Sequence, residues 1–381
     1  MKNMLKHLAG LMLALLLSCT GGKTIEITVT NPSGVARPAE VVVVDYKALQ
    51  KAFSGLQLEP DIQISDENGS LLPTQFDDIN GDQKWDELVF IADFAANQTR
   101  IFRFKQRFLE PDSATDVTRL WVSLDADLAR PMMVDEAHGK QLETELRYAG
   151  VTWGTASQPF RLKFDTLNAI DLLPQSSGNL ILEQQIDSLA YKNGIVWPPA
   201  ENPETGGTGG FVFAQNGNLF PPVDLFGFQA RILTRGPLRT VVRMDYEDWP
   251  VDTLQSKVAW LIMQYHHTPV TEHRLYFKPS ASGEMPTVAV GTPGKPLANN
   301  PSGVFFSQLD SNALAYFGLV FPPEQHDQSV QILRKITLKP DLSKLPALRY
   351  FAIYSQEPPE SLQLLVNQLL ETQRLPMQIS F

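Results

Sequence analysis

The segment 76-FDDINGDQKWDELVFIADF-94 decides the fold class, because it sets an acidic turn between two strand-like runs. Asn-Gly-Asp is an ordinary turn sequence, and the apolar run that follows is typical of a β-strand. Similar runs surround it, separated by PSG and ENG turns: IEITVTN (25–31), AEVVVVDY (39–46), DIQIS (61–65) and RIFRFKQ (100–106). The first part of the chain is therefore predicted to be a small antiparallel β-sandwich.

The rest of the chain is also rich in predicted strands. The polar stretch LEPDSATD (109–116) marks a domain boundary, and strand-like runs follow it: RLWVSL (119–124), FRLKFD (160–165), LILEQQID (180–187), GFVFA (210–214), FQARILT (228–234), TVVRMDY (240–246), SKVAWLIMQYH (256–266), EHRLYF (272–277), LAYFGLVF (314–321) and ALRYFAIYS (347–355). Residues 359–371 carry leucines on a common side, which predicts one C-terminal helix before a last strand. We expect an all-β protein with a small sandwich in residues 20–110 and a larger β-sandwich domain in residues 111–381.

Residues 1–19 have the pattern of an export signal. Lys2 and Lys6 precede an apolar run, residues 8–17, that is too short to span a bilayer. The following LLSC (16–19) resembles the lipobox of bacterial lipoproteins, in which the signal is cleaved before the cysteine and lipid is attached to its sulfur. The alternative is a plain secretory signal with a chance Cys19. We expect a protein lipid-anchored at Cys19 in the periplasm or at the outer membrane, touching the membrane only through that anchor.

Charge and cysteine content exclude several functions. Without Lys2 and Lys6, 30 basic residues face 42 acidic ones. Nonspecific binding to nucleic acid or to an anionic membrane depends on a basic face, so this balance disfavours both partners. Cys19 is the only cysteine, which excludes an intrachain disulfide. An anionic substrate would need a local basic pocket.

The acidic turn has the spacing of a calcium loop. Counted from the first aspartate, side-chain oxygens fall at positions one, three, five and nine: Asp78, Asn80, Asp82 and Asp86. Calcium takes six to eight oxygen ligands, and short loops supply them at alternating positions plus a backbone carbonyl, here that of Lys84. Position six is Gln83, where the EF-hand loop has Gly. The residues predict a structural calcium ion, with a metal-free hairpin turn as the alternative.

An arginine series stands in 231-RILTRGPLRTVVR-243. Residues two or four apart in a strand share a face, so Arg231 is expected beside Arg235, and Arg239 beside Arg243, across a Gly-Pro turn. Arginine binds carboxylates and sulfates in bidentate geometry. The alternative is a solvated outer sheet face in which the arginines pair with Asp and Glu.

Two further groups of residues could carry acid–base chemistry. The segment 265-YHHTPVTEHRLYF-277 contains His266, His267 and His273, which Pro269 could fold together into a metal or acid–base site. The alternative is structural histidines on a strand. The segment 187-DSLAYKNGIVWPP-199 and the glycine-rich residues 205–210 bring Tyr, Lys and Trp to one long loop, and loops of that length are usually functional or mobile.

Several segments together resemble the family catalogued as domain of unknown function 4861. They are 72-LPTQFDDINGDQKWDELVFIADF-94, 160-FRLKFDTLNAIDL-172, 205-TGGTGGF-211, 235-RGPLRTVVRMDYEDW-249 and the terminal helix and strand. The family contains secreted or lipid-anchored proteins that accompany polysaccharide lyases and glycoside hydrolases in bacterial glycan-degradation gene clusters. The resemblance implies that the larger domain is a mutarotase-like β-supersandwich. It also implies an activity that eliminates water or sugar from uronate-containing oligosaccharides.

The chain departs from the family pattern at two places. The family has Tyr-His where Tyr191-Lys192 stand, and Trp-Glu where Trp153-Gly154 stand. If those positions carry catalysis, this chain has an altered substrate or no activity.

The resulting hypothesis is a lipoprotein that acts on acidic oligosaccharides by β-elimination, which requires a base, an acid and a group that neutralises the uronate carboxylate. The expected residues are Tyr191 as base or acid with Lys192 or His267 as its partner, Arg161 or Arg239 as neutraliser, and Trp197 and Arg235 in substrate binding. The alternative is a non-catalytic glycan-binding or scaffold lipoprotein, favoured if these residues lie on separate faces. A sugar epimerase or mutarotase follows only from fold analogy.

Overall fold

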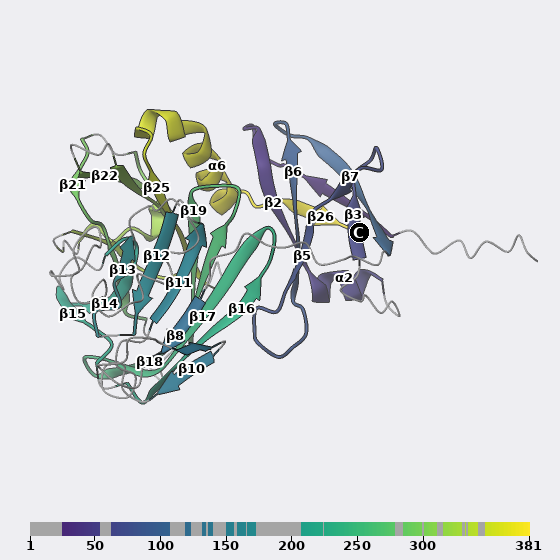
Figure 1. Cartoon of the computed structure of the whole chain (residues 1–381). Helices are drawn as coiled ribbons and strands as arrows, with labels where there is room; N and C mark the ends of the chain where they lie inside the picture. The colour runs from purple at the N-terminus through teal and green to yellow at the C-terminus, as the bar shows by residue number, and fades with distance from the viewer. Residues whose placement is uncertain are drawn as a thin grey trace, which may run out of the picture.

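The computed structural model describes most of the chain in separate ranges: 25–53, 62–106, 119–122, 132–134, 136–139, 150–155, 158–164, 166–172, 207–223, 225–278, 285–298, 301–310, 315–329, 332, 334–341 and 347–381. These residues form antiparallel sheets with one longer helix near the C-terminus, so the all-β prediction is confirmed (Figure 1).

The N-terminal unit consists of two sheets that pack face to face. The five-stranded sheet has the order β26 (Gln378–Ser380), β1 (Ile25–Thr30), β7 (Thr99–Gln106), β3 (Ile62–Ser65) and β4 (Leu71–Leu72). The three-stranded sheet has the order β2 (Arg37–Asp45), β6 (Glu87–Phe94) and β5 (Thr74–Asp77). Alternate side chains of these strands meet in one apolar core that includes Ile27, Val42, Phe90 and Phe102.

One short helix, α2 (Tyr46–Ala52), follows β2 and was not predicted. Its N-cap is Asp45, whose carboxylate accepts a hydrogen bond from the backbone N–H of Ala48 (2.7 Å). Leu49 is its one buried residue, so the helix has little apolar periodicity for a sequence pattern to reveal.

The large unit is built on a nine-stranded antiparallel sheet. Its order is β10 (Glu136–Gly139), β16 (Gly227–Arg235), β17 (Arg239–Val251), β18 (Leu254–Tyr265), β19 (Val270–Lys278), β25 (Leu348–Ser355), β23 (Ala315–Val320), β22 (Val304–Asp310) and β21 (Lys295–Pro296). We call its two faces inner and outer. The inner face packs against two smaller sheets, and the outer face of β17–β25 carries the contacts with the N-terminal unit.

The first smaller sheet has the order β13 (Ile170–Leu172), β12 (Gln158–Lys163), β11 (Gly150–Thr155), β8 (Arg119–Val122) and β9 (Met132–Val134). The second has the order β15 (Asn218–Phe220), β14 (Phe211–Gln215), β20 (Thr287–Gly291) and β24 (Lys335–Leu338). All three sheets share one apolar core with Trp153, Trp249 and Trp260.

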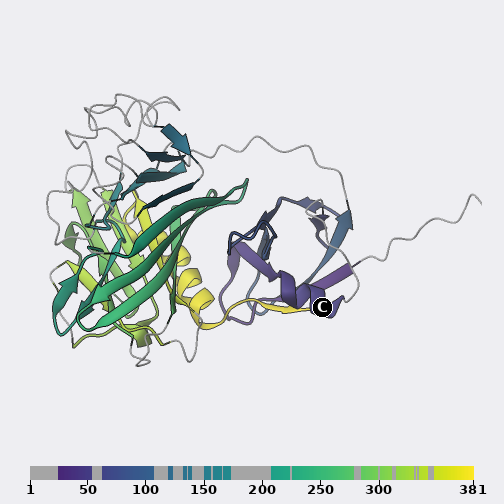
Figure 2. The same cartoon turned by 90° about the horizontal axis from the view of Figure 1, so that it is seen from below.

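The C-terminal segment links the two units. After the short 3-10 helices η3 (Pro323–Gln325) and η4 (Pro359–Leu362), the helix α6 (Gln363–Arg374) packs Val366 and Leu369 onto the outer sheet face beside Phe351. The chain then crosses to the N-terminal unit, where β26 pairs with β1 (Figure 2). The predicted helix and last strand are therefore present. The last strand belongs to the predicted second domain by sequence, but in space it completes a sheet of the N-terminal unit.

A buried side-chain amide seals the junction between the units. Gln75 accepts hydrogen bonds from the backbone N–H groups of Leu238 (2.9 Å) and Arg239 (3.0 Å), and it donates to the Arg239 carbonyl (2.8 Å). Gly236 stands so close that an added Cβ would lie 2.0 Å from the Gln75 Oε1 atom. Only a residue without a side chain leaves room for this contact.

We expect Gly236→Ala to lower the free energy of unfolding by about 1–3 kcal/mol, because the new methyl group must displace Gln75 or the turn. Chemical denaturation at neutral pH would measure the change. Gly34→Ala is the matched control, since nothing lies within 4 Å of its added Cβ. An equal loss of unfolding free energy in the two variants would contradict the close contact between Gly236 and Gln75.

Candidate functional site

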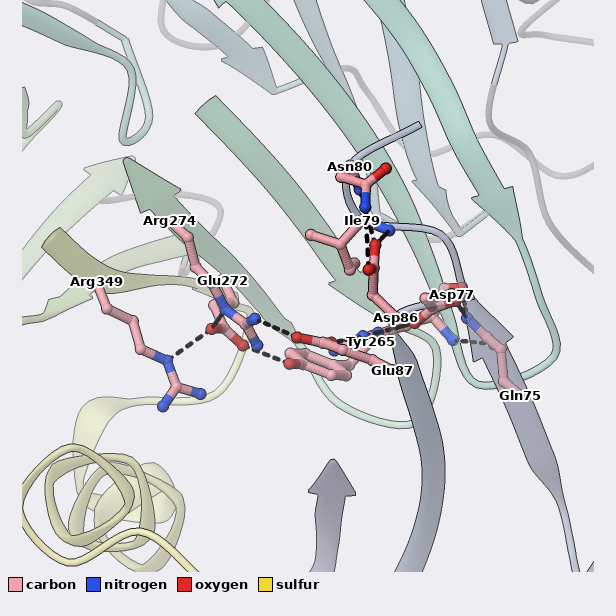
Figure 3. A network of polar contacts seen from close by, with 11 residues as sticks. Gln75, Asp77, Ile79, Asn80, Asp86, Glu87, Tyr265, Glu272, Arg274 and Arg349 are labelled. Carbon is pink, nitrogen blue, oxygen red and sulfur yellow. Dashed lines mark hydrogen bonds and ion pairs between the residues drawn. The ribbon is translucent and has the colours of Figure 1, made fainter. Parts of the chain in front are cut away.

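A chain of buried charges crosses the junction between the units. The Arg239 guanidinium is completely buried, and it donates to the carboxylates of Asp77 and Glu87 from the N-terminal unit. Glu87 also pairs with Arg274 (3.0 Å), which in turn donates to Glu272 (Figure 3). Buried ions are tolerated when each has a close partner of opposite charge.

Glu272 is the centre of the second half of this chain of charges. Its carboxylate accepts from Arg274, from Arg349 (2.6 Å) and from the hydroxyl of Tyr265. Burial alone would raise the pKa of Glu272, but the two guanidinium groups outweigh burial and hold it well below its ordinary value. Burial and the neighbouring Glu272 carboxylate raise the pKa of Tyr265 to about 12. Glu272 is therefore charged at neutral pH, with the protonated phenol of Tyr265 beside it.

The outer face of the nine-stranded sheet carries a row of arginines. The strand registers align Arg231 with Arg243, and Arg274 with Arg349, with Leu261 between the two pairs. A β-bulge between residues 232 and 234 shifts the alternation of β16. Arg235 therefore lies on the opposite face of the sheet from Arg231, although the simple two-residue period had placed them on one face. The neighbour of Arg231 is Arg243 on the adjacent strand.

This row of arginines holds the acidic turn. Arg243 donates to the carbonyl of Ile79 (3.0 Å) and forms a bidentate pair with Asp245 (2.7 Å for both bonds). Ile79 packs into the apolar cluster of Val241 and Leu261. Two motifs more than 150 residues apart in the sequence therefore meet as one interface. Arg243 pairs with an acidic residue, as in the alternative of a solvated outer face, but its side chain is only 20% exposed.

The oxygens of the acidic turn are largely committed to the loop itself. The Asp78 carboxylate accepts from the backbone N–H groups of residues 81, 82 and 83, and the Asp86 carboxylate accepts from the backbone of Ile79 and Asn80. Asp82 accepts from the backbone of Lys84 (2.9 Å). Within the described ranges, no three His, Cys, Asp or Glu side chains converge to hold a metal ion. A calcium ion at this turn stays a prediction.

Beside the acidic turn, the two units enclose a cleft of about 400 Å³, which we call the interdomain cleft. Ligand pockets typically have volumes of about 300–1,000 Å³. The residues that line it come from β2, α2 and the acidic turn on one wall and from β17, β18 and β19 on the other. They are Asp45, Lys47, Ile79, Asn80, Asp86, Glu87, Arg243, Asp245, Tyr246, Glu247, Lys257, Val258, Ala259, Leu261, Tyr276, Phe277 and Lys278.

Every carboxylate in the interdomain cleft already has a partner. Asp45 caps α2, Asp86 binds the acidic turn, and Glu87 joins the buried network. Asp245 pairs with Arg243, and Glu247 pairs with Lys257, both on the same wall. In contrast, Lys47 and Lys278 are exposed and form no ion pair with any described residue. The cleft therefore has one lysine without an ion-pair partner on each wall, while its carboxylates already accept hydrogen bonds or ion pairs.

The structure places two of the predicted arginines in buried ion pairs. Arg239 lies inside the junction with Asp77 and Glu87, so the expectation that it meets a substrate carboxylate is corrected: its partners already occupy it. Arg161 on β12 is also buried and pairs with Asp171 of β13 (3.0 Å). Arg235 is exposed at the end of β16, outside the interdomain cleft.

The predicted histidine cluster does not form. His267 lies in the turn after β18, with its Nε2 atom 3.1 Å from the Ala39 carbonyl, beside a crevice of only about 60 Å³. His273 is buried in the inner core, where it stacks on Tyr350 and accepts a hydrogen bond from Trp260 (3.1 Å). His266 lies 3.1 Å from the hydroxyl of Thr240. The three side chains have different surroundings and share no ligand site.

The remaining predicted residues cannot be placed. Cys19, Tyr191, Lys192 and Trp197 lie outside the described residues, as does the predicted strand 180–187. The sequence analysis did not single out Lys47, Tyr276 or Lys278, which line the interdomain cleft. The last two alternate with Arg274 on β19, so a strand-period analysis of that segment could have placed them on one face.

Comparison with known families gives one match. Residues 29–194 match the model of a family described as a domain of unknown function, DUF4861. The match confirms the predicted resemblance over this part of the chain, which includes the acidic turn and the first smaller sheet of the large unit. No curated protein matches the chain.

Two solved structures from Enterococcus faecalis are similar in shape. One is a protein in glycosyl hydrolase family 38, with a TM-score of 0.49 and 9% identity over 95% of this chain and 48% of that chain. The other is an alpha-mannosidase, with a TM-score of 0.46 and 9% identity over 94% of this chain and 46% of that chain. This chain therefore spans about half the length of each, and the activity of those proteins is not transferred to it.

We expect Glu272→Ala to lower the free energy of unfolding by about 3–5 kcal/mol, because it leaves Arg274 and Arg349 without their shared buried carboxylate. Urea denaturation at pH 7 would measure the loss. Glu357→Ala is the control, since Glu357 is exposed and its carboxylate has no partner among the described residues. A loss no larger than that of the control would refute a stabilising role for the network.

The protein should lose stability as the pH falls. Burial lowers the pKa of His273 to about 3, whereas an unfolded histidine titrates near about 6.5. Between these values the unfolded chain binds a proton that the folded chain does not, so stability falls by up to about 1.4 kcal/mol for each unit of pH lost. The lowered pKa of Glu272 and Glu87 adds a further loss below about pH 4.3.

Unfolding measured at several pH values would separate these contributions. His273→Gln should flatten the slope between about pH 6.5 and 4.5 and leave the steeper loss below that range. An unchanged slope in this variant would show that His273 titrates normally in the folded protein.

Proposed function

We propose that this protein binds acidic oligosaccharides that contain uronate residues, and that the interdomain cleft is the binding site. The observation that carries the proposal is the distribution of charge in the cleft. Its carboxylates already accept hydrogen bonds from the backbone or ion pairs from the same protein, while Lys47 and Lys278 on opposite walls have no ion-pair partner among the described residues. A uronate carboxylate between the walls would neutralise them.

The shape of the cleft supports a sugar ligand. Tyr276 is half-buried on β19, two residues from Lys278, so its ring and the ammonium group share one face of the strand. An aromatic ring gives an apolar face for a sugar ring, while the polar groups around it fix the orientation of the ligand. The volume of about 400 Å³ is compatible with one or two sugar residues.

The proposed setting is outside the cytoplasm. The LLSC segment and the apolar run before it support a lipid anchor at Cys19, in the periplasm or at the outer membrane. Among the described helices, none is long and apolar enough to cross a membrane.

A second candidate function is β-elimination at the same site. The specific support is Tyr276, which lies within electrostatic range of both Arg243 and Arg274. In such a reaction a base removes the proton beside the uronate carboxylate, a cation stabilises the enolate, and the C–O bond to the leaving sugar or water breaks. Tyr276 would be the base that takes this proton. Arg243 would bind the carboxylate, which is the role predicted for Arg161 or Arg239.

We expect Lys47→Met and Lys278→Met each to weaken the binding of uronate oligosaccharides about tenfold or more, because each removes a charge-assisted contact. Calorimetric titration of the full chain with a panel of uronate oligosaccharides and their carboxyl-reduced counterparts would measure this. Lys51→Met, on the same helix as Lys47 but outside the cleft, is the matched control.

If the uronate oligosaccharides and their carboxyl-reduced counterparts bind with equal affinity, or if neither binds, the proposed uronate site is overturned. The ultraviolet absorbance of an unsaturated uronate, followed in the same mixtures, separates the two functions. If Tyr276→Phe keeps binding and abolishes the rise in absorbance, the elimination is established. If the wild type binds the oligosaccharides and the absorbance does not rise, the protein is a binding protein without elimination activity.

A further inference from the structure

A second recess lies at the far edge of the large unit. It has a volume of about 440 Å³ and is lined by Thr292, Gly294, Lys295, Pro296, Phe305, Arg334 and Lys335. We call it the edge recess. Its strand β21 is the last of the nine-stranded sheet, remote from the N-terminal unit that forms the interdomain cleft (Figure 1). The two sites share no residue.

The edge recess is lined by positive charge alone. Lys295, Arg334 and Lys335 contribute three cations, and no described residue of the lining is acidic. Lys295 and Arg334 are exposed and form no ion pair with any residue in the described ranges, whereas Lys335 is 7% exposed. Lys295 and Arg334 side by side repel each other, so an anion between them would be stabilised.

The backbone places Arg334 in the recess at a cost to stability. Its φ is +56°, a left-handed conformation that favours glycine and is uncommon for a residue with a long side chain. The backbone N–H of Thr292 donates to the Arg334 carbonyl (2.9 Å), which fixes the residue there. Glycine would be free of this strain, so an arginine at this position indicates that its side chain has a role.

The rest of the lining is suited to a sugar ring. Phe305 and Pro296 give apolar surfaces beside the cations, and the Thr292 hydroxyl adds a polar group. Gly294 holds the loop close to β22, because an added Cβ would lie 2.4 Å from the Gln308 carbonyl oxygen. A pocket with apolar walls and a few polar groups is the usual form of a small-molecule site.

We propose that the edge recess is a second binding site, and that it takes a sugar residue carrying one oxyanion group, either a sulfate ester or a carboxylate. Arg334 would bind the oxyanion in bidentate geometry with Lys295 beside it. Phe305 would contact the ring. This site stands independently of the interdomain cleft.

The test uses galactose 6-sulfate, galacturonate and neutral galactose in calorimetric titrations of the full chain carrying Lys47→Met and Lys278→Met, which remove the unpaired lysines of the interdomain cleft. This double variant should bind the two anionic sugars and not galactose, with affinity that falls as salt rises. Arg334→Gly and Lys295→Met should each weaken that binding about tenfold or more. Arg334→Gly should also keep or raise the melting temperature, because glycine adopts the positive φ without strain.

The Lys47→Met, Lys278→Met background prevents galacturonate bound at the interdomain cleft from masking a loss at the edge recess. Retained affinity when Arg334→Gly or Lys295→Met is added to this background, equal binding of galactose, or no binding of either anionic sugar by the background protein would each overturn the proposal. The relative affinities for galactose 6-sulfate and galacturonate identify which oxyanion the recess prefers.

Discussion

The buried charges at the junction are the constraint on which the rest of the structure depends. Arg239 is fully buried in the large unit, yet its carboxylate partners, Asp77 and Glu87, belong to the N-terminal unit. Separating the units would break both of these buried ion pairs at once. Glu272 extends the same requirement to Arg274 and Arg349. The two units are therefore held in one relative position by charges that neither can satisfy alone. The interdomain cleft has fixed walls for this reason.

The same arrangement explains why a cleft beside the most acidic segment of the chain has lysines without an ion-pair partner. The acidic turn uses its carboxylates on its own backbone, and the arginine row uses its guanidinium groups on the turn and on neighbouring carboxylates. Lys47 and Lys278, which no local motif connects, are left without an ion-pair partner among the described residues. A net negative protein can in this way still offer ammonium groups to an anionic ligand.

Strand content, the C-terminal helix and the family resemblance could all be predicted from the sequence, because alternation and turn residues are local signals. The acidic turn and the arginine series were also visible, but only as separate motifs. Their meeting depends on tertiary packing and on the bulge in β16, which reverses the expected face of Arg235. Arg161 and Arg239 are chemically suited to bind a carboxylate, and residue type could not show that Asp171, Asp77 and Glu87 already do so. Lys47 carries no motif at all.

The pairing of β26 with β1 gives the molecule an unusual connectivity. The chain leaves the N-terminal unit after β7, forms the whole large unit, and returns to the edge of the first sheet, where Ser380 lies opposite Thr28. The large unit is thus an insertion attached at both of its ends. A single proteolytic cut between β7 and β8 would leave two fragments that are held together by the pairing of β26 with β1 and by the ion pairs of Arg239 with Asp77 and Glu87. Such a nicked protein should remain one particle, and a second cut between α6 and β26 would be needed to remove the strand pairing as well.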